Sequence, residues 1–389
     1  MKPPRALALA LCAAALALPV SIALSNAALG LLTLALLYRL RGADRGRALA
    51  ACRAEPALAA VVAYIVAGLI ASIFGFGLAH SLHDNAKDLH RLWSLSLFVA
   101  ALALEPEAPL WPAFAAGFAL AAAVGVRQSA LGWLHTGALE RAAAFVHPVT
   151  FGEQMGLGTL GGLCWLARPS IPGARARAAA AAATLLYAAA MTLSQTRAAM
   201  LAFAAGAVAV ALLEPRARRW AAAGLGLGAL GAGVSQYIRF SRGQFNLFGP
   251  ETEHSRLILW RVAWRMFRDH PWTGVGLRHY ATLFDRYSPP YEGQAHWGTA
   301  HNIYLHQLAE RGLIGFAALM CLLAVLLVRG WRAGRANGSA AALWAAAAVP
   351  AFMIMNGTET ALQTEQFATL FLMIWAWGTI SLRPRAEIL

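Results

Sequence analysis

Three charged or titratable side chains could carry chemistry in this chain, and the first is Arg197. It closes the run Ser194-Gln195-Thr196-Arg197, directly ahead of an apolar stretch that predicts a helix. A helix N-terminus carries partial positive charge and free N–H groups, so an arginine placed there concentrates positive potential until an anion binds. The position predicts a phosphate site, with Gln195 as a candidate contact. An arginine that reaches lipid headgroups is the alternative.

The second is Arg256, near the start of an amphipathic helix predicted over residues 255–268. At about 100° per residue, Arg256 falls on the apolar face, whereas Arg261 and Arg265 fall on the polar face. The apolar face is formed by Trp260, Ala263, Trp264 and Phe267. A cation on a buried face needs a carboxylate or a substrate anion as its partner, because an unpaired buried charge costs several kcal/mol. We expect a substrate phosphate at Arg256, with a structural ion pair as the alternative. Arg261 and Arg265 are further candidate contacts.

The third is His301, in a stretch that leads directly into another apolar run. On a helix beginning at His301, this imidazole would share the protein-facing side with Leu305 and Leu308. His306 and Glu310 would point away. A neutral imidazole can accept the proton of an attacking hydroxyl near pH 7. We therefore predict His301 as a general base, with a histidine satisfied by the core as the alternative.

The elements that position these residues are predicted to be membrane helices. The chain has 389 residues, of which 59% are hydrophobic and 13% charged, whereas soluble domains carry about 25% charged residues. Apolar runs near the roughly 17 residues that cross a bilayer recur throughout. We predict an all-α polytopic protein of about 12 transmembrane helices, at residues 5–22, 24–38, 57–77, 92–104, 111–126, 150–167, 178–193, 198–214, 220–236, 313–328, 340–356 and 366–382.

The distribution of Lys and Arg sets the predicted orientation. These residues concentrate in the loops on the N-terminal side of the membrane, so both termini are expected in the cytoplasm. The chain then divides into residues 1–235 with helices one to nine, a large outer catalytic segment at 236–312, and residues 313–389 with helices ten to twelve. This orientation and the lipid headgroups explain the net charge of +14, so no nucleic-acid partner is expected.

In this topology Arg197, Arg256 and His301 reach the same outer boundary of the membrane. Two cations beside a base suit glycosyl transfer from a polyprenyl diphosphate. Its leaving group needs charge stabilisation, while the attacking hydroxyl needs a base. The energy must reside in the lipid-linked bond, because nucleotide sugars are absent outside the membrane. The chain has no D-x-D pair, so no metal ion and no other cofactor are expected.

Four stretches resemble the O-antigen ligase and O-antigen polymerase superfamily. They are the Ser-x-Thr-Arg turn at 194–197, the Ser-Arg-x-x-x-Trp helix at 255–260, the turn at 269–276 and the run at 301–315. The resemblance implies a GT-C-like, inverting, metal-independent glycosyltransferase of the bacterial inner membrane, with its active site facing the periplasm. It also implies that His301 is the base and that Arg197 and Arg256 bind the diphosphate. Asn302 and Tyr304 are candidate substrate contacts whose roles stay open.

Within that superfamily the sequence favours a ligase. Polymerases commonly have two sizeable outer loops, and here only the segment after the ninth span is large. A ligase would move O-antigen from undecaprenyl diphosphate to lipid A-core, so these two lipid-linked glycans and membrane lipid are the expected partners. The alternatives are a polymerase of O-antigen or exopolysaccharide, and a secondary transporter. Twelve spans suit a transporter, but the sequence contains no internal repeat and its polar residues gather at one face.

Overall fold

Every regular element of the chain is a helix within the residues that the structure, a computed structural model, describes. These are residues 6–137, 139–168, 173–241, 250–288, 298–336 and 338–380. Within these ranges five helices are long and apolar enough to cross a membrane: α2 (Ile22–Arg39), α4 (Pro56–Phe74), α6 (Leu110–Thr136), α8 (Ala174–Leu193) and α14 (Ile303–Ala336). The predicted all-α class is confirmed, and the chain is a helical multi-pass membrane protein. The count of twelve crossings stays a prediction.

Each of the twelve predicted spans overlaps a helix. The others are α1 (Ala6–Ala17), α5 (Leu78–Leu104), α7 (Pro148–Ala167), α9 (Arg197–Leu213), α10 (Arg218–Ser241), α15 (Ala340–Asn356) and α16 (Glu365–Ile380). Outside the spans lie α3 (Asp44–Arg53), α11 (Pro250–Asp269), α12 (His279–Thr282) and α13 (Phe284–Tyr287), with the 3-10 turns η1 (Pro215–Ala217) and η2 (Ala361–Gln363). The short span expected at 92–104 is the second half of α5, whose 27 residues begin at Leu78.

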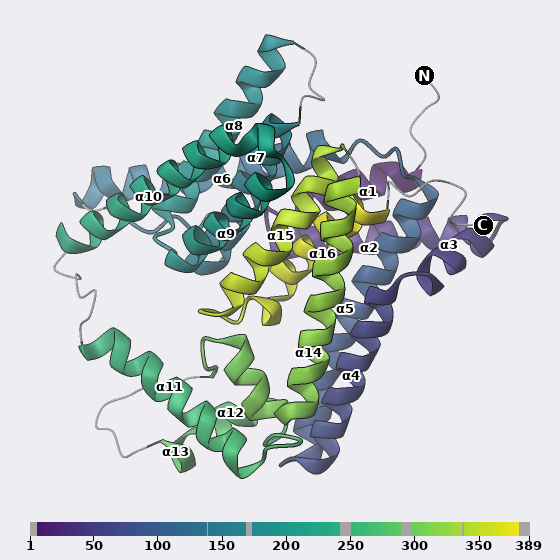
Figure 1. Cartoon of the computed structure of the whole chain (residues 1–389), viewed down its shortest axis with the longest axis vertical. Helices are drawn as coiled ribbons and strands as arrows, with labels where there is room; N and C mark the ends of the chain where they lie inside the picture. The colour runs from purple at the N-terminus through teal and green to yellow at the C-terminus, as the bar shows by residue number, and fades with distance from the viewer. Residues whose placement is uncertain are drawn as a thin grey trace.

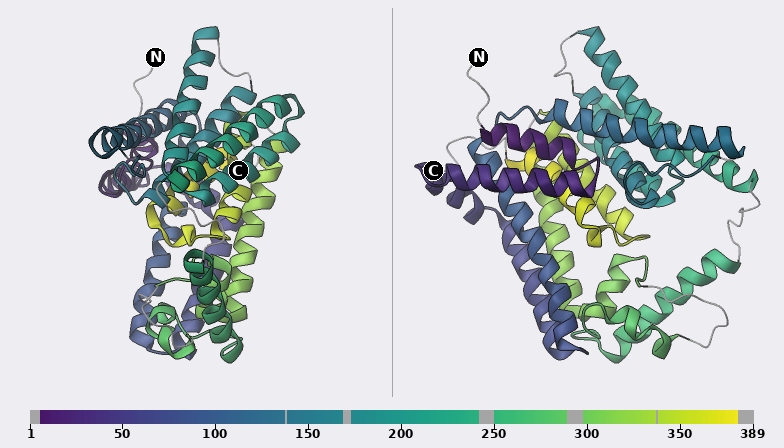
Figure 2. Two further views of the ribbon diagram at one scale, coloured as in Figure 1. Left: turned by 90° about the vertical axis from the view of Figure 1, so that its left-hand side faces the viewer. Right: turned by 180° about the vertical axis from the view of Figure 1, so that it is seen from behind.

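Helices α4, α5 and α14 run side by side as a long group (Figures 1 and 2). Helices α11, α12 and α13 lie against one end of this group, whereas α6 to α10 gather at the other end (Figure 1). Helices α15 and α16 lie between them, with α15 packed on α9 and α14 and α16 packed on α5. The connection between α15 and α16 therefore faces the first turns of α14 (Figure 1).

Helix α14 is broken at Gly312, whose φ of +59° and ψ of −161° are not helical. The turn that follows α11 fills the break with its backbone. Val275 N–H donates to Ala309 O at 2.9 Å. Leu313 N–H donates to Pro271 O at 2.8 Å. A break in a helix leaves backbone N–H and C=O groups without their helical hydrogen-bond partners, and buried groups of this kind need other partners. The turn supplies these partners and fixes the direction of the first turns of α14.

Two apolar cores hold the described residues together. The larger core runs through the helices from α1 to α16 and contains the stacked aromatic rings of Trp111 and Trp344. The smaller core joins α11, α12 and α13 to the first turns of α14. It consists of Ile258, Leu259, Val262, Ala263, Met266, Val275, Tyr280, Phe284, Tyr287, Ala300 and Ala309. Because the smaller core reaches Ala309, α11 and the start of α14 are positioned by the same contacts.

Candidate active site

Glu359, in the connection between α15 and α16, holds two of the predicted site residues together. Its Oε2 lies 2.9 Å from His301 Nδ1, and its Oε1 accepts a hydrogen bond from Arg256 Nη2 at 3.1 Å. The Glu359 side chain is only 13% exposed. An ionised carboxylate can only accept, so His301 Nδ1 must carry the proton of this bond. In the neutral ring, Nε2 is then the nitrogen that accepts a proton.

Asn302 and Tyr304, which follow His301 closely in the chain, hold it beside Glu359. Asn302 Nδ2 donates to Gly357 O at 2.9 Å, and Tyr304 Oη donates to Met353 O at 2.8 Å. Both bonds tie the start of α14 to the end of α15. His301 itself has a φ of +46°, a left-handed conformation that costs a residue with a side chain on the order of 1–3 kcal/mol. Asn302 and Tyr304 thus position the imidazole, whatever contact they make with a substrate.

Arg256 lies at the edge of the buried face of α11. The side chains that α11 buries are Ile258, Leu259, Val262, Ala263 and Met266. This face is rotated from the one predicted by the helical wheel, which included Trp264, because Trp264 is 49% exposed. The Arg256 side chain is itself 42% exposed. The expected burial of this cation is therefore wrong, since α11 packs on α14 through a different stripe, and its carboxylate partner is Glu359.

The Ser194-Gln195-Thr196 turn is held by Arg141, in the connection between α6 and α7. Arg141 Nε donates to Ser194 O at 2.9 Å, and its Nη2 donates to Thr196 Oγ1 at 3.3 Å. Burial lowers the pKa of the Arg141 guanidinium, and the Glu359 carboxylate counters part of that effect. The Arg141 guanidinium therefore lies within electrostatic range of the Glu359 carboxylate.

Gln195 and Arg197 flank Thr196 in this turn with opposite exposures. Gln195 is buried with a φ of +56°, and its Nε2 has no hydrogen-bond partner within the described ranges. Arg197 is exposed at the first position of α9, as the sequence predicts. Within the part of the chain that the structure describes Arg197 forms no ion pair, so its charge adds directly to the positive N-terminus of the helix. The turn thus presents a cation and an amide that can bind an anion.

Residues 182–320 match the family described as O-Antigen ligase. This match, which covers about a third of the chain, supports membership of the O-antigen ligase superfamily. No curated protein matches it at the level of whole sequences. The segment matched to the O-antigen ligase family contains Arg197, Arg256 and His301, whereas Glu359 and Arg141 lie outside it.

Sequence reasoning missed both residues that lie outside the O-antigen ligase match. Glu359 is a lone acid between two threonines after an apolar span, and its only signal was that Arg256 needed a carboxylate or an anion as its partner. Arg141 stands in a loop without a motif. The structure does not bring Arg261 or Arg265 to His301 through any described contact. Arg265 Nη1 instead donates to Tyr287 O at 2.9 Å, which ties α11 to α13.

His306 and Glu310 were predicted to point away from the protein, and this prediction is wrong. They are 2% and 3% exposed, and His306 Nε2 lies 3.3 Å from Glu310 Oε2. Glu310 Oε1 also accepts from Tyr280 N–H at 3.1 Å. Burial and the nearby Glu310 carboxylate raise the pKa of Tyr280 above its usual range, so it stays a neutral phenol. The wheel failed because α12 and α5 cover the face of α14 that a helix at a surface would expose.

In the part of the chain that the structure describes, no group of three or more His, Cys, Asp or Glu side chains is placed to bind a metal ion. His80, His83 and His90 lie on α5, a regular helix. The contacts at the site are those of an imidazole oriented by a carboxylate that also binds the Arg256 guanidinium. This arrangement can accept a proton from a hydroxyl and stabilise a leaving anion.

Proposed function

We propose that the chain is an inverting glycosyltransferase that moves a glycan from a polyprenyl diphosphate to a sugar hydroxyl. The proposal rests on one observation above the others, the contact of Glu359 with both His301 and Arg256 at 2.9 and 3.1 Å. A base for the acceptor and a cation for the leaving group are thereby held by one carboxylate. Membership of the O-antigen ligase superfamily supports the same chemistry.

In the proposed reaction the acceptor hydroxyl oxygen attacks the anomeric carbon of the donor sugar. The bond between that carbon and the diphosphate oxygen breaks on the opposite face, so the anomeric configuration inverts. His301 Nε2 takes the hydroxyl proton, and Glu359 stabilises the imidazolium that forms. The leaving diphosphate keeps the bonding electron pair and meets Arg256 and Arg197, with Arg141 behind the turn.

We propose that the site faces the periplasm, with the outer segment at 236–312 lying between helices nine and ten of twelve. The exposed side chains of Arg197 and Arg256 suit a diphosphate that enters from the outer leaflet. Residues 242–249 and 289–297 of that segment lie outside the described residues. The proposed substrates are undecaprenyl-diphosphate-linked O-antigen and lipid A-core.

A polymerase would use the same base and cations, and only its acceptor would differ. The sequence favours the ligase because a single outer segment is large. The test is reconstitution of the full chain with a lipid-diphosphate-linked glycan, with and without lipid A-core. Product on lipid A-core supports the ligase, lengthening of the donor glycan indicates a polymerase, and counterflow of solute without covalent product indicates a transporter.

A further inference from the structure

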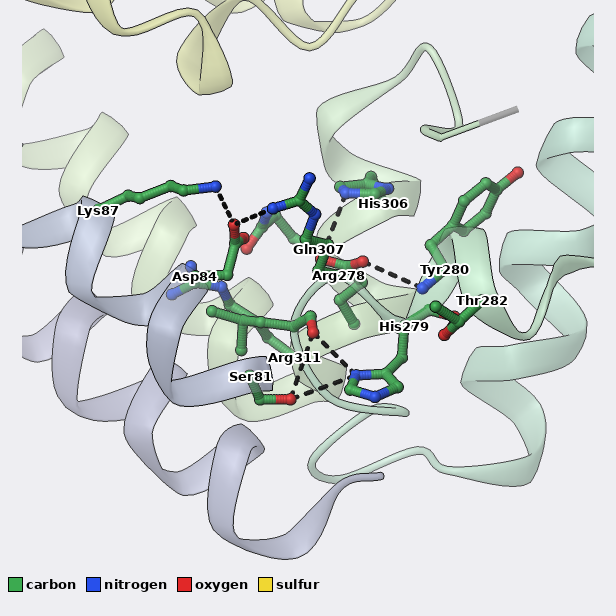
Figure 3. Close-up of polar contacts among 12 residues, drawn as sticks. Ser81, Asp84, Lys87, Arg278, His279, Tyr280, Thr282, His306, Gln307 and Arg311 are labelled. Atoms are coloured by element: carbon green, nitrogen blue, oxygen red, sulfur yellow. Dashed lines mark hydrogen bonds and ion pairs between the residues drawn. The ribbon is translucent and has the colours of Figure 1, made fainter. Parts of the chain in front are cut away.

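A second polar cavity lies beside the candidate active site, between α5, α12 and the first turns of α14. Its volume is about 380 Å³, which is within the range of about 300–1,000 Å³ found for small-ligand sites. Lys87 and Asp84 on α5, Arg278 before α12, and Gln307 and Arg311 on α14 line it. Figure 3 shows these side chains converging from three elements. The mechanism proposed above uses none of them.

The floor of the cavity is a network of paired charges. Arg311 and Arg91 both form ion pairs with Asp88, and each of these three side chains is at most 10% exposed. Arg91 Nη2 also donates to Leu362 O at 2.5 Å. The Arg311 guanidinium lies 4.2 Å from the ring centroid of Tyr64. Buried charges are tolerated only when they are paired, and here two guanidinium groups share the one carboxylate of Asp88.

The charged side chains at the mouth of the cavity are also paired, but they are accessible to solvent. Asp84 Oδ1 lies 2.7 Å from Lys87 Nζ and 3.9 Å from Arg278 Nη1. Lys87 and Arg278 are 43% and 54% exposed. Arg278 has a φ of +61°, a strained conformation that persists only where the surroundings enforce it. The Glu310 carboxylate accepts a hydrogen bond from the backbone N–H of Arg278 and also contacts His306. This hydrogen bond stabilises the left-handed conformation of Arg278.

The charges of the lining balance, and this decides the class of ligand. Four carboxylates, Asp84, Asp88, Glu310 and Glu365, face four cations, Lys87, Arg91, Arg278 and Arg311, and the lining also contains the His306 imidazole that contacts Glu310. A diphosphate or another polyanion would meet as many negative as positive groups. A neutral ligand rich in hydroxyl groups can donate to the carboxylates and accept from the guanidinium groups at the same time.

We propose that this cavity binds a neutral saccharide, roughly one or two sugar rings in size. The cavity adjoins the candidate active site through both segments that build it. Thr299 lines the cavity and lies two residues before His301. Gln363 also lines it and lies four residues after Glu359. A saccharide held there would extend toward the His301–Glu359 pair.

The saccharide would come from one of the two substrates of the proposed function, on which this inference rests. A sugar of the acceptor would be positioned so that its neighbouring hydroxyl reaches His301. A sugar of the donor would be a distal ring of the glycan chain. The chemistry of recognition is the same, so kinetics with each substrate varied in turn must separate the two sources.

The test fills the cavity without removing a polar contact. Ala281 lines the cavity on α12, and Ala281→Trp would occupy its space. The matched control is Thr282→Trp, at the next residue, which is exposed and does not line the cavity. Both full-length variants are purified in nanodiscs and titrated with a lipid-free core oligosaccharide and with a lipid-free O-antigen repeat, with binding followed by saturation-transfer NMR.

We expect one saccharide to bind the wild type and the Thr282→Trp variant equally, and Ala281→Trp to weaken that binding at least tenfold. The KM of the matching substrate should rise by the same factor while the KM of the other substrate stays unchanged. Equal binding by both tryptophan variants, or no saccharide binding by the wild type, would overturn the inference. Saccharide binding by a wild type that catalyses no transfer would overturn the proposed function and leave the cavity assignment intact.

Discussion

The substitution Glu359→Gln tests whether one carboxylate serves both halves of the reaction. It keeps the shape of the side chain but removes the charge that His301 Nδ1 and Arg256 Nη2 share, at 2.9 and 3.1 Å. A hydrogen bond to a charged group contributes about 1.5–3 kcal/mol. If that contribution is realised in the transition state, where the imidazolium forms, kcat falls about 10- to 150-fold.

The assay is the initial rate of glycan transfer by the reconstituted chain, with donor and acceptor each varied. We expect kcat to fall while both KM values change less than threefold, because Glu359 orients His301 and Arg256 and does not itself contact the substrates. In a His301→Ala background the same substitution should lower kcat much less than in the wild type, since the part of its effect that passes through His301 is already lost. A purely structural residue would lower kcat by the same factor in both backgrounds.

The control is Glu105→Gln. Glu105 also pairs with an arginine, Arg39, at 3.2 Å, and its side chain is 15% exposed against 13% for Glu359. It lies in the connection between α5 and α6, outside the site. We expect wild-type kcat from this variant. A Glu359→Gln variant with wild-type kcat would refute the assignment of Glu359 as the residue that orients the base.

Three further outcomes are expected. Arg256→Lys should raise the KM for the donor about tenfold, because an ammonium group cannot reproduce the guanidinium contacts with a phosphate. The control Arg261→Lys should leave this KM unchanged. Full activity of Arg256→Lys would show that only the positive charge at this position matters. Gly312→Ala should lower the free energy of unfolding by about 2 kcal/mol or more, measured by thermal melting. Gly312 has a φ of +59°, and the new Cβ would lie 2.5 Å from the backbone nitrogen of Thr273. Gly233→Ala in α10, where nothing lies within 4 Å, should be neutral or stabilising in the same melting assay. Transfer should be unaffected by a chelator, and a loss that added Mg²⁺ restores would contradict a reaction that uses no metal.

The helices could be predicted from the sequence because membrane-length apolar runs are a strong and local signal. The break in α14 could not, although Gly274, Gly276 and Gly312 all stood in the family-like stretches. Their positive φ angles are required by a turn that inserts its backbone into a helix from far along the chain. Such a contact joins segments that are separated in sequence, and hydrophobic periodicity carries no information about it.

The same limit explains what was missed at the site. His301 and Arg256 could be proposed because each is an unusual residue type in an apolar or amphipathic setting. Glu359 could not, because one acid in a short connection is ordinary until its two partners are seen beside it. The helical wheel misplaced His306 and Glu310 for a related reason. It assumes one buried face, and α14 is covered on both sides where it meets α5 and α12.

The most direct test of the central claim is the rate of glycan transfer by His301→Ala, compared with the wild type at saturating donor and acceptor. Loss of a general base typically costs about 10²–10⁴ in rate, so we expect kcat to fall by at least about a hundredfold while membrane insertion and melting temperature are kept. Donor binding, which we assign to Arg197 and Arg256, should be preserved. A kcat within twofold of the wild type would contradict the claim that His301 takes the proton of the acceptor.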